Sequence, residues 1–172
     1  MANTRTARSF PLAAWLLVLG GVLYLLIELL SHIGAGSIDG VLAFIAYLAL
    51  TVAFVVFFLW RSIDLLLRIA FIVAAVGFAL LALANIATLG AVPLKIADVL
   101  VLVGVLVAGI IVFVRHIFTR GAGLSFLILG IVTALLFLSA LVTFITGTLL
   151  VILAVLFGVL LIVTGVLIAR RR

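Results

Sequence analysis

The chain of 172 residues is 70% hydrophobic and 8% charged, with a mean hydropathy of +1.78. A soluble domain is about 45–50% apolar and about 25% charged, so this composition excludes a soluble globular fold and favours the bilayer as solvent. The net charge of +6 does not indicate nucleic-acid binding, because the ten basic residues punctuate apolar runs instead of gathering on a polar face. The absence of cysteine excludes disulfides and thiolate metal sites.

The first apolar run follows Arg5 and Arg8 and has the outline of a signal peptide. The run is longer than the about 7–15 apolar residues of such a peptide, and no A-x-A cleavage site follows it. We therefore predict a retained membrane helix over residues 11–33. Ser9 is expected to cap this helix and Pro11 to lie in its first turn.

Further apolar runs of similar length follow, separated by short breaks. They predict helices over residues 39–60, 65–89, 94–117, 122–145 and 148–169. Each is near the about 20 residues that cross the hydrocarbon of a bilayer. The sequence therefore predicts an all-α, polytopic membrane protein of six transmembrane helices. Residues 1–172 form a single membrane domain, because the turns are too short to hold another.

Basic residues mark alternate ends of these predicted helices. Nine of the ten lie in the N-terminus, the second-to-third turn, the fourth-to-fifth turn and the C-terminus: Arg5, Arg8, Arg61, Arg68, Arg115, Arg120, Arg170, Arg171 and Arg172. Those four segments share one side of a six-span protein, and Lys95 lies on the other. The positive-inside rule then places both termini in the cytoplasm. We expect Asp64 to lie on the cytoplasmic side as a surface partner of Arg61 and Arg68.

The spacing of the arginines also predicts an internal repeat. Arg61, Arg115 and Arg170 are separated by 54 and 55 residues, and "ALLALANIAT" from Ala79 aligns with "ALLFLSALVT" from Ala134. We infer three helical hairpins, at about 11–60, 65–117 and 122–169. Each hairpin is expected to begin and end in the cytoplasm.

Glycine, proline and arginine recur within these hairpins. The last run contains "LLIVTGVLIARR", and the second hairpin turns through a proline in "GAVPLKIADVLVLVGVLVAGI". In this layout the chain resembles the HdeD family of bacterial short-repeat membrane proteins, although the first and third hairpins lack the proline-containing turn. The matching positions are Pro93, Gly104, Gly109, Gly158, Gly165 and Arg170. The resemblance implies a bacterial inner-membrane protein without enzymatic activity that serves acid or general stress resistance.

Small residues are the expected contacts between the helices, because burial against lipid-like leucine cannot drive helix association. The candidates are Gly20, Gly21, Ala70, Ala74, Ala75, Ala79, Gly104, Gly130, Ala134, Gly158 and Gly165. Phenylalanines are expected to face lipid or to fill gaps. This set comprises Phe54, Phe57, Phe58, Phe113, Phe118, Phe126, Phe137 and Phe144.

Polar residues gather near the outer ends of the first four runs. Tyr24, Glu28 and His32 are spaced by four residues and share one helix face. An acid at the depth of Glu28 is costly unless it pairs, faces water or is protonated. We predict a candidate polar cluster of Tyr24, Glu28, His32, Asn85, Lys95 and Asp98, with Asp39 close to the same interface.

A structural explanation of the same residues stays open and is slightly favoured. A Glu28–Lys95 or Glu28–His32 pair would fix the order of the helices without any further function. Asp98 follows Lys95 by one turn, and we expect those two to form a local ion pair near the start of their helix.

No catalytic or metal motif stands out from the remaining residues. His32 and His116 lie toward opposite membrane faces and cannot share one haem, and the chain has no H-E-x-x-H, G-x-S-x-G or P-loop motif. We expect no enzymatic activity, cofactor or metal. Besides the stress-related function, two alternatives are an accessory structural subunit of a larger membrane complex and a proton-linked transporter or channel that uses Glu28. The expected partners are the lipid bilayer and a homo-oligomer or larger membrane complex, and not nucleic acid.

Overall fold

The computed structural model describes the backbone of residues 4–32, 36–60, 64–87, 91–142 and 147–170, and the side chains of 11–31, 40–60, 64–87, 91–139 and 147–170. The helices are α1 (Thr4–His32), α2 (Gly36–Phe58), α3 (Leu65–Ala84), α4 (Ala91–Val114), α5 (Arg120–Val142) and α6 (Thr148–Ala169). All six are long and apolar enough to cross a membrane. The described part of the chain is thus all-α, and the prediction of six helices suited to cross a membrane is confirmed.

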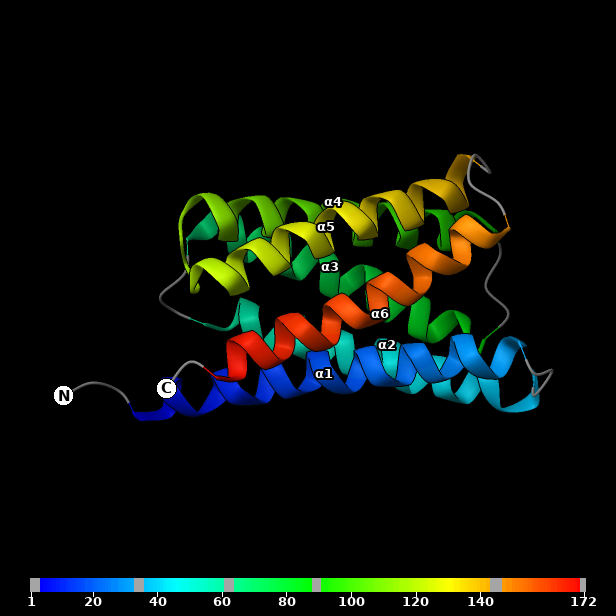
Figure 1. Ribbon diagram of the computed structural model, residues 1–172, viewed down its shortest axis with the longest axis horizontal. Coiled ribbons are helices and arrows are strands. Elements are labelled where there is room, and N and C mark those ends of the chain that lie inside the picture. The colour runs from blue at the N-terminus through cyan, green and yellow to red at the C-terminus, as the bar shows by residue number, and fades with distance from the viewer. Residues whose placement is uncertain (1–3, 33–35, 61–63, 88–90, 143–146, 171–172) are drawn as a thin grey trace.

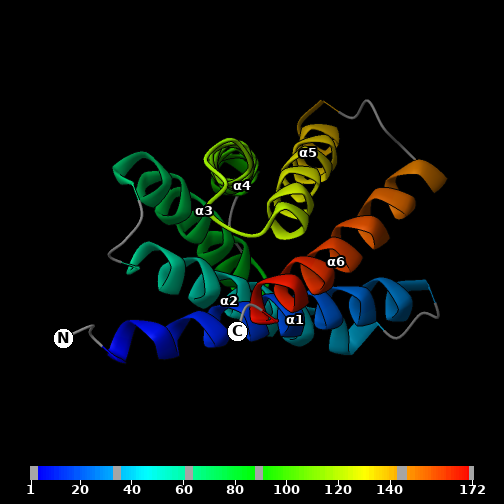
Figure 2. The ribbon, with the colours of Figure 1, turned by 60° about the vertical axis from the view of Figure 1, so that its left-hand side comes forward.

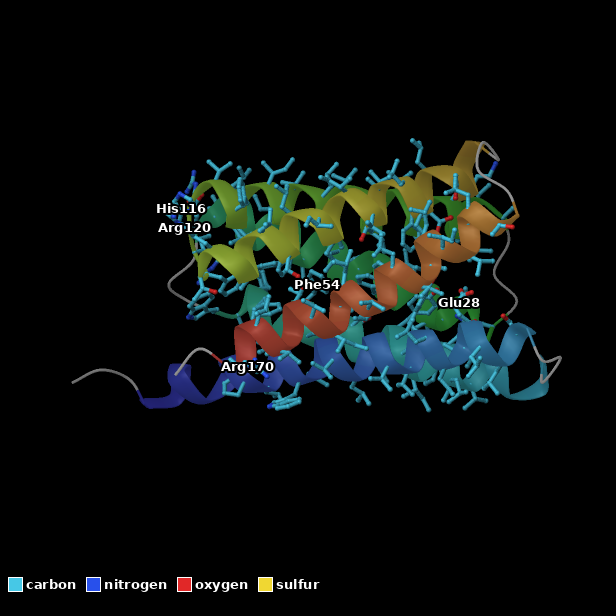
Figure 3. All side chains as sticks on the ribbon, in the orientation of Figure 1. Glu28, Phe54, His116, Arg120 and Arg170 are labelled. Atoms are coloured by element: carbon cyan, nitrogen blue, oxygen red, sulfur yellow. The ribbon has the colours of Figure 1, made fainter. Side chains whose placement is uncertain are left out.

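The helices form a closed ring in chain order (Figures 1 and 2). Each packs against the helices before and after it, and α6 returns to pack against α1. Consecutive helices run in opposite directions, as short connections require, so α1 begins and α6 ends at the same end of the bundle (Figure 1). Arg120 and Arg170 lie at that end, and Glu28 lies toward the other (Figure 3). We call these the basic end and, because a pocket opens there, the pocket end.

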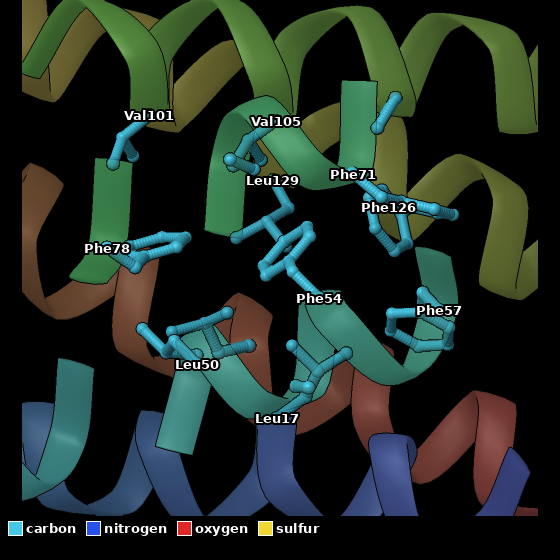
Figure 4. Close-up of a cluster of buried hydrophobic side chains, with 14 of the residues drawn as sticks. Leu17, Leu50, Phe54, Phe57, Phe71, Phe78, Val101, Val105, Phe126 and Leu129 are labelled. Carbon is cyan, nitrogen blue, oxygen red and sulfur yellow. The ribbon is translucent and has the colours of Figure 1, made fainter. Parts of the chain in front are cut away.

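Aromatic side chains fill the interior of the ring (Figure 4). The aromatic core consists of Phe54 and Phe57 from α2, Phe71 and Phe78 from α3, and Phe126 from α5, each at most 1% exposed. The rings of Phe57 and Phe71 stack at 5.2 Å, and those of Phe54 and Phe78 at 5.5 Å. Ring pairs at these separations add attraction beyond the area that they bury.

The described phenylalanines of the predicted set have different environments, and Phe58 is partly buried against the core. Phe118 and Phe137 are buried like the aromatic core, whereas Phe113 is exposed at the surface of α4. Phe144 lies outside the described residues. Most of the phenylalanines predicted to face lipid or fill gaps thus fill the interior of the ring, and Phe113 faces outward.

Glycines set the closest approaches between neighbouring helices, as predicted. A Cβ added to Gly21 would lie 2.7 Å from the Gly158 carbonyl oxygen across the α1–α6 interface. A Cβ on Gly104 would meet the Ala74 backbone between α4 and α3. One on Gly130 would lie 3.1 Å from the Leu106 Cα between α5 and α4. Such contacts bring backbones close enough for the packing that holds helices together in lipid.

Two helix ends differ from the sequence-based expectation. α1 begins at Thr4, so Ser9 lies within the helix rather than at its cap, and Pro11 is a helix-interior proline. An interior proline removes one backbone hydrogen bond and crowds the carbonyl four residues earlier, yet α1 continues on both sides of Pro11. α3 ends at Ala84 instead of residue 89, because Asn85 follows as the C-cap and its Nδ2 donates to the Leu81 carbonyl at 2.7 Å.

Candidate functional site

A pocket of about 230 Å³ opens into the ring at the pocket end. Its polar wall consists of Tyr24 and Glu28 from α1, Tyr47 from α2 and Asp98 from α4. Its apolar wall comes from the two last helices: Leu136 and Phe137 of α5 with Leu150, Val151 and Ala154 of α6. Five of the six helices thus contribute to one site. The remaining helix, α3, borders it indirectly through Phe78, whose ring stacks on Tyr47 at 6.2 Å.

The two tyrosines form the aromatic part of the polar wall. The Tyr24 ring meets Tyr47 edge to face at 6.5 Å and Phe157 of α6 at 5.0 Å. Glu28 follows Tyr24 by four residues and therefore lies above it on the same face of α1. These two residues of the predicted stripe both line the pocket.

Tyr47 belongs to this site although the sequence did not assign it there. Its position in an apolar run gives no periodic signal. A usable signal existed: Tyr24 and Tyr47 are the only two tyrosines of the chain, and they lie at similar distances from the turn that joins α1 to α2. Antiparallel neighbours place such residues at the same depth.

The other predicted members of the cluster do not line this pocket. Asn85 is exposed and caps α3. Lys95 is exposed and borders a separate surface groove together with Val92, Ile96, Val99 and Leu100. The backbone of His32 ends α1, and Asp39 lies in the first turns of α2, but the side chains of both are outside the described part of the chain. The structure therefore joins Tyr24, Glu28 and Asp98 from the predicted set.

The expected ion pair between Lys95 and Asp98 is wrong. Among residues with described side chains, Lys95 forms no ion pair with Asp98 or with Glu28. Asp98 lies beside the buried face of α4 that carries Ala97 and Val101, whereas Lys95 lies on the outward side. The packing of this face against the ring directs Asp98 to the pocket and Lys95 to the surface.

A different ion pair forms at the basic end. The Arg115 Nη1 donates to the Asp64 Oδ2, so the partner of Asp64 comes from the end of α4 and not from the neighbouring Arg68. Arg68 instead donates through Nη2 to the Trp60 carbonyl at 3.3 Å. The expected role of Arg61 lies outside the described residues. Asp64 does remain a surface residue, and its pair joins the α2–α3 and α4–α5 connections.

An apolar layer lies in the interior of the ring. Leu17, Leu50, Phe54 and Leu129 belong to it, all with 0% exposure (Figure 4). Charged side chains are absent from this layer within the described residues. The polar wall of the pocket thus lies toward one end of the bundle, and the described polar side chains buried elsewhere in the bundle are the hydroxyls of Ser125, Thr133, Ser139 and Thr164.

The histidines and acids of the described residues do not form a cluster of three or more that suits a metal ion. His116 lies at the basic end (Figure 3), a bundle length away from the end of α1.

No protein-family model, curated protein or solved structure matches this chain.

Proposed function

We propose that the chain is a multi-pass protein of the bacterial inner membrane with both termini in the cytoplasm. The basic end supports this orientation, since Arg115, Arg120 and Arg170 lie where α1 begins and α6 ends. The pocket then opens toward the periplasm. The alternating ring order of the helices agrees with three hairpin repeats, which we propose as the origin of the fold.

Its proposed role is non-enzymatic and lies in acid or envelope stress, as the resemblance to the HdeD family implies. The observation that carries this proposal is the placement of Glu28 and Asp98 in one outward-opening pocket. Carboxylates that face the periplasm gain protons when the external pH falls. A pocket with an apolar wall binds different molecules once its two carboxylates are protonated. A fall in external pH would therefore change what the protein binds.

Survival of acid challenge tests this role. A deletion strain should survive a drop in external pH less well than its parent, and the native chain should restore survival. A Glu28→Gln, Asp98→Asn double variant should fail to restore it, whereas Asp64→Asn, which removes an acid from the basic end, should restore it fully. Unchanged survival of the deletion strain would remove the stress role.

The pocket also favours a second candidate, a proton-linked transporter or channel in which Glu28 takes protons from outside. Tyr24 and Glu28 give a polar path through the outer half of the ring. The aromatic core must then move to complete that path. Proton flux into liposomes that contain the purified chain would support this function, and flux that is unchanged in Glu28→Gln would exclude conduction through that residue.

A further inference from the structure

A second hollow, of about 360 Å³, lies at the basic end where α4 ends and α5 begins. We call it the basic groove. Its apolar walls are Val112 and Phe113 of α4, Phe118 of the connection and Leu124 of α5. Phe113 is 37% exposed and Leu124 is 47% exposed, so the groove opens on the outer surface of the bundle. Both residues lie in segments suited to cross a membrane, so this opening faces lipid.

Gly123 leaves the basic groove open, because it places no side chain between α5 and α4. A Cβ added to it would lie 3.7 Å from the Phe113 Cα and 3.8 Å from the Val112 carbonyl oxygen, at ordinary contact distance. The two helices are closer at Gly130, where an added Cβ would lie 3.1 Å from the Leu106 Cα. The walls of an empty hollow lose dispersion contacts, so the surrounding lipid is expected to fill this one.

The rim of the basic groove carries hydrogen-bond donors and positive charge. His116, Thr119 and Arg120 line it, and Figure 3 shows His116 and Arg120 at the basic end. The Arg120 guanidinium stays positive and offers several N–H donors, and an imidazole keeps at least one N–H in either protonation state. The first turn of α5 contains no acidic residue that would offset this charge.

The chain supplies no carboxylate to Arg120 among the residues whose side chains are described. Of the four acidic residues, Asp64 is paired with Arg115, and the two acids of the pocket lie at the opposite end. The fourth, Asp39, belongs to the first turns of α2, which begins at the pocket end (Figure 1). An anion that neutralises Arg120 would therefore come from outside the chain.

His116 keeps its side chain at a conformational cost. Its φ of 50° is one that glycine adopts more readily. Unfavourable backbone angles of this kind occur most often at functional sites. The imidazole meets the Phe113 ring edge to face at 6.5 Å, which places it beside the apolar wall of the groove.

We propose that the basic groove binds one anionic phospholipid. An acyl chain lies against Phe113 and Leu124, and the phosphate accepts hydrogen bonds from Arg120 and His116 at the rim. A free phosphate would leave the apolar walls uncovered, and a zwitterionic phospholipid would bring its positive group close to Arg120. The groove lies at the opposite end from the pocket, so this binding does not depend on the function proposed for that pocket.

Native mass spectrometry of the purified full-length chain tests the proposal. The protein is offered equal amounts of phosphatidylglycerol and phosphatidylcholine with identical acyl chains. We expect each chain to retain one phosphatidylglycerol in preference to phosphatidylcholine. An excess of glycerol 1-phosphate, which carries the phosphate without the acyl chains, should not displace it.

Variants then locate the site. Arg120→Gln should lower the preference about fivefold, the effect of one basic residue on an anionic lipid at the membrane surface. Arg170→Gln, which removes the same charge from the same end, should preserve it. His116→Gly should also lower the preference, at a position whose backbone suits glycine. Gly123→Leu fills the groove and should abolish the retention of phosphatidylglycerol, whereas Gly121→Leu is its control, since nothing lies within 4 Å of a Cβ added there.

Circular dichroism and gel filtration establish which variants fold. His116→Gly and Gly123→Leu keep the test decisive if Arg120→Gln does not fold. Equal retention of the two lipids by the native chain, or displacement by glycerol 1-phosphate, would overturn the proposal. Equal losses in Arg120→Gln and Arg170→Gln, or native retention in folded Gly123→Leu, would do the same.

Discussion

Glu28 and Asp98 are two of only four acidic residues in this apolar chain. Each lies in a helix long enough to cross the membrane, where an ionisable side chain costs free energy. Both side chains border the same pocket, so the protein accommodates these two ionisable groups at one site. The shared position of these two acids at one cavity is the reason that we propose a function for this site.

His116 is a residue whose backbone conformation is unfavourable for its side chain. It follows α4 with φ of 50°, and the next amide, of Ile117, donates back to the Val112 carbonyl at 3.3 Å. This is the helix-ending geometry that glycine adopts most readily. We expect His116→Gly to raise the free energy of unfolding by about 1 kcal/mol, and His116→Val to lower it. Denaturant unfolding in detergent measures both, and a less stable glycine variant would contradict the conformational explanation.

At the scale of helices, close packing decides which pairs are fixed. α1 and α6 meet through Gly21 and Gly158, and Gly165 approaches the Ala14 carbonyl in the same interface. This contact joins the first helix of the chain to the last and closes the ring. The α5–α6 pair lacks such a contact among the described glycines and has the pocket instead.

Gly21→Ala tests the closure of the ring. Its new Cβ would lie 2.7 Å from the Gly158 carbonyl oxygen, a backbone atom that can move only with its helix. We expect a loss of about 1–3 kcal/mol in the free energy of unfolding, the usual cost of overpacking. Gly121→Ala is the matched control, because nothing lies within 4 Å of its added Cβ. Equal stability of the two variants would show that α1 and α6 are not held by this contact.

The whole molecule has charge at one end and its pocket at the other. If the basic end is cytoplasmic, a green fluorescent protein fused after the C-terminus should fluoresce, and an alkaline phosphatase at the same place should be inactive. Active phosphatase would reverse the orientation and turn the pocket toward the cytoplasm.

The closed ring also bears on the partners of the chain. Each helix already packs against two others, so the fold does not require a partner to cover an incomplete interface. We expect the protein to purify in mild detergent without stoichiometric amounts of another protein. Recovery of a large complex in fixed proportion would favour the accessory-subunit alternative.

Much of the fold could be predicted because the bilayer imposes it. Runs of about 20 apolar residues had to be spanning helices, and short turns made consecutive helices antiparallel. Half of the predicted polar cluster was found at the pocket, since helical spacing alone places Tyr24 and Glu28 on one face. The missing member, Tyr47, and the inward position of Asp98 depend on how α2 and α4 are turned within the ring.

The sequence by itself determined the helices and their alternating direction, because each apolar run is long enough to span a bilayer and short turns join consecutive runs. Only the tertiary structure decided which side chains face the interior. Lipid is as apolar as leucine or phenylalanine, so no hydrophobic pattern marks the inner face of a membrane helix. The aromatic core around Phe54 and the placement of Glu28 and Asp98 in one pocket follow from close packing of helices distant in the chain.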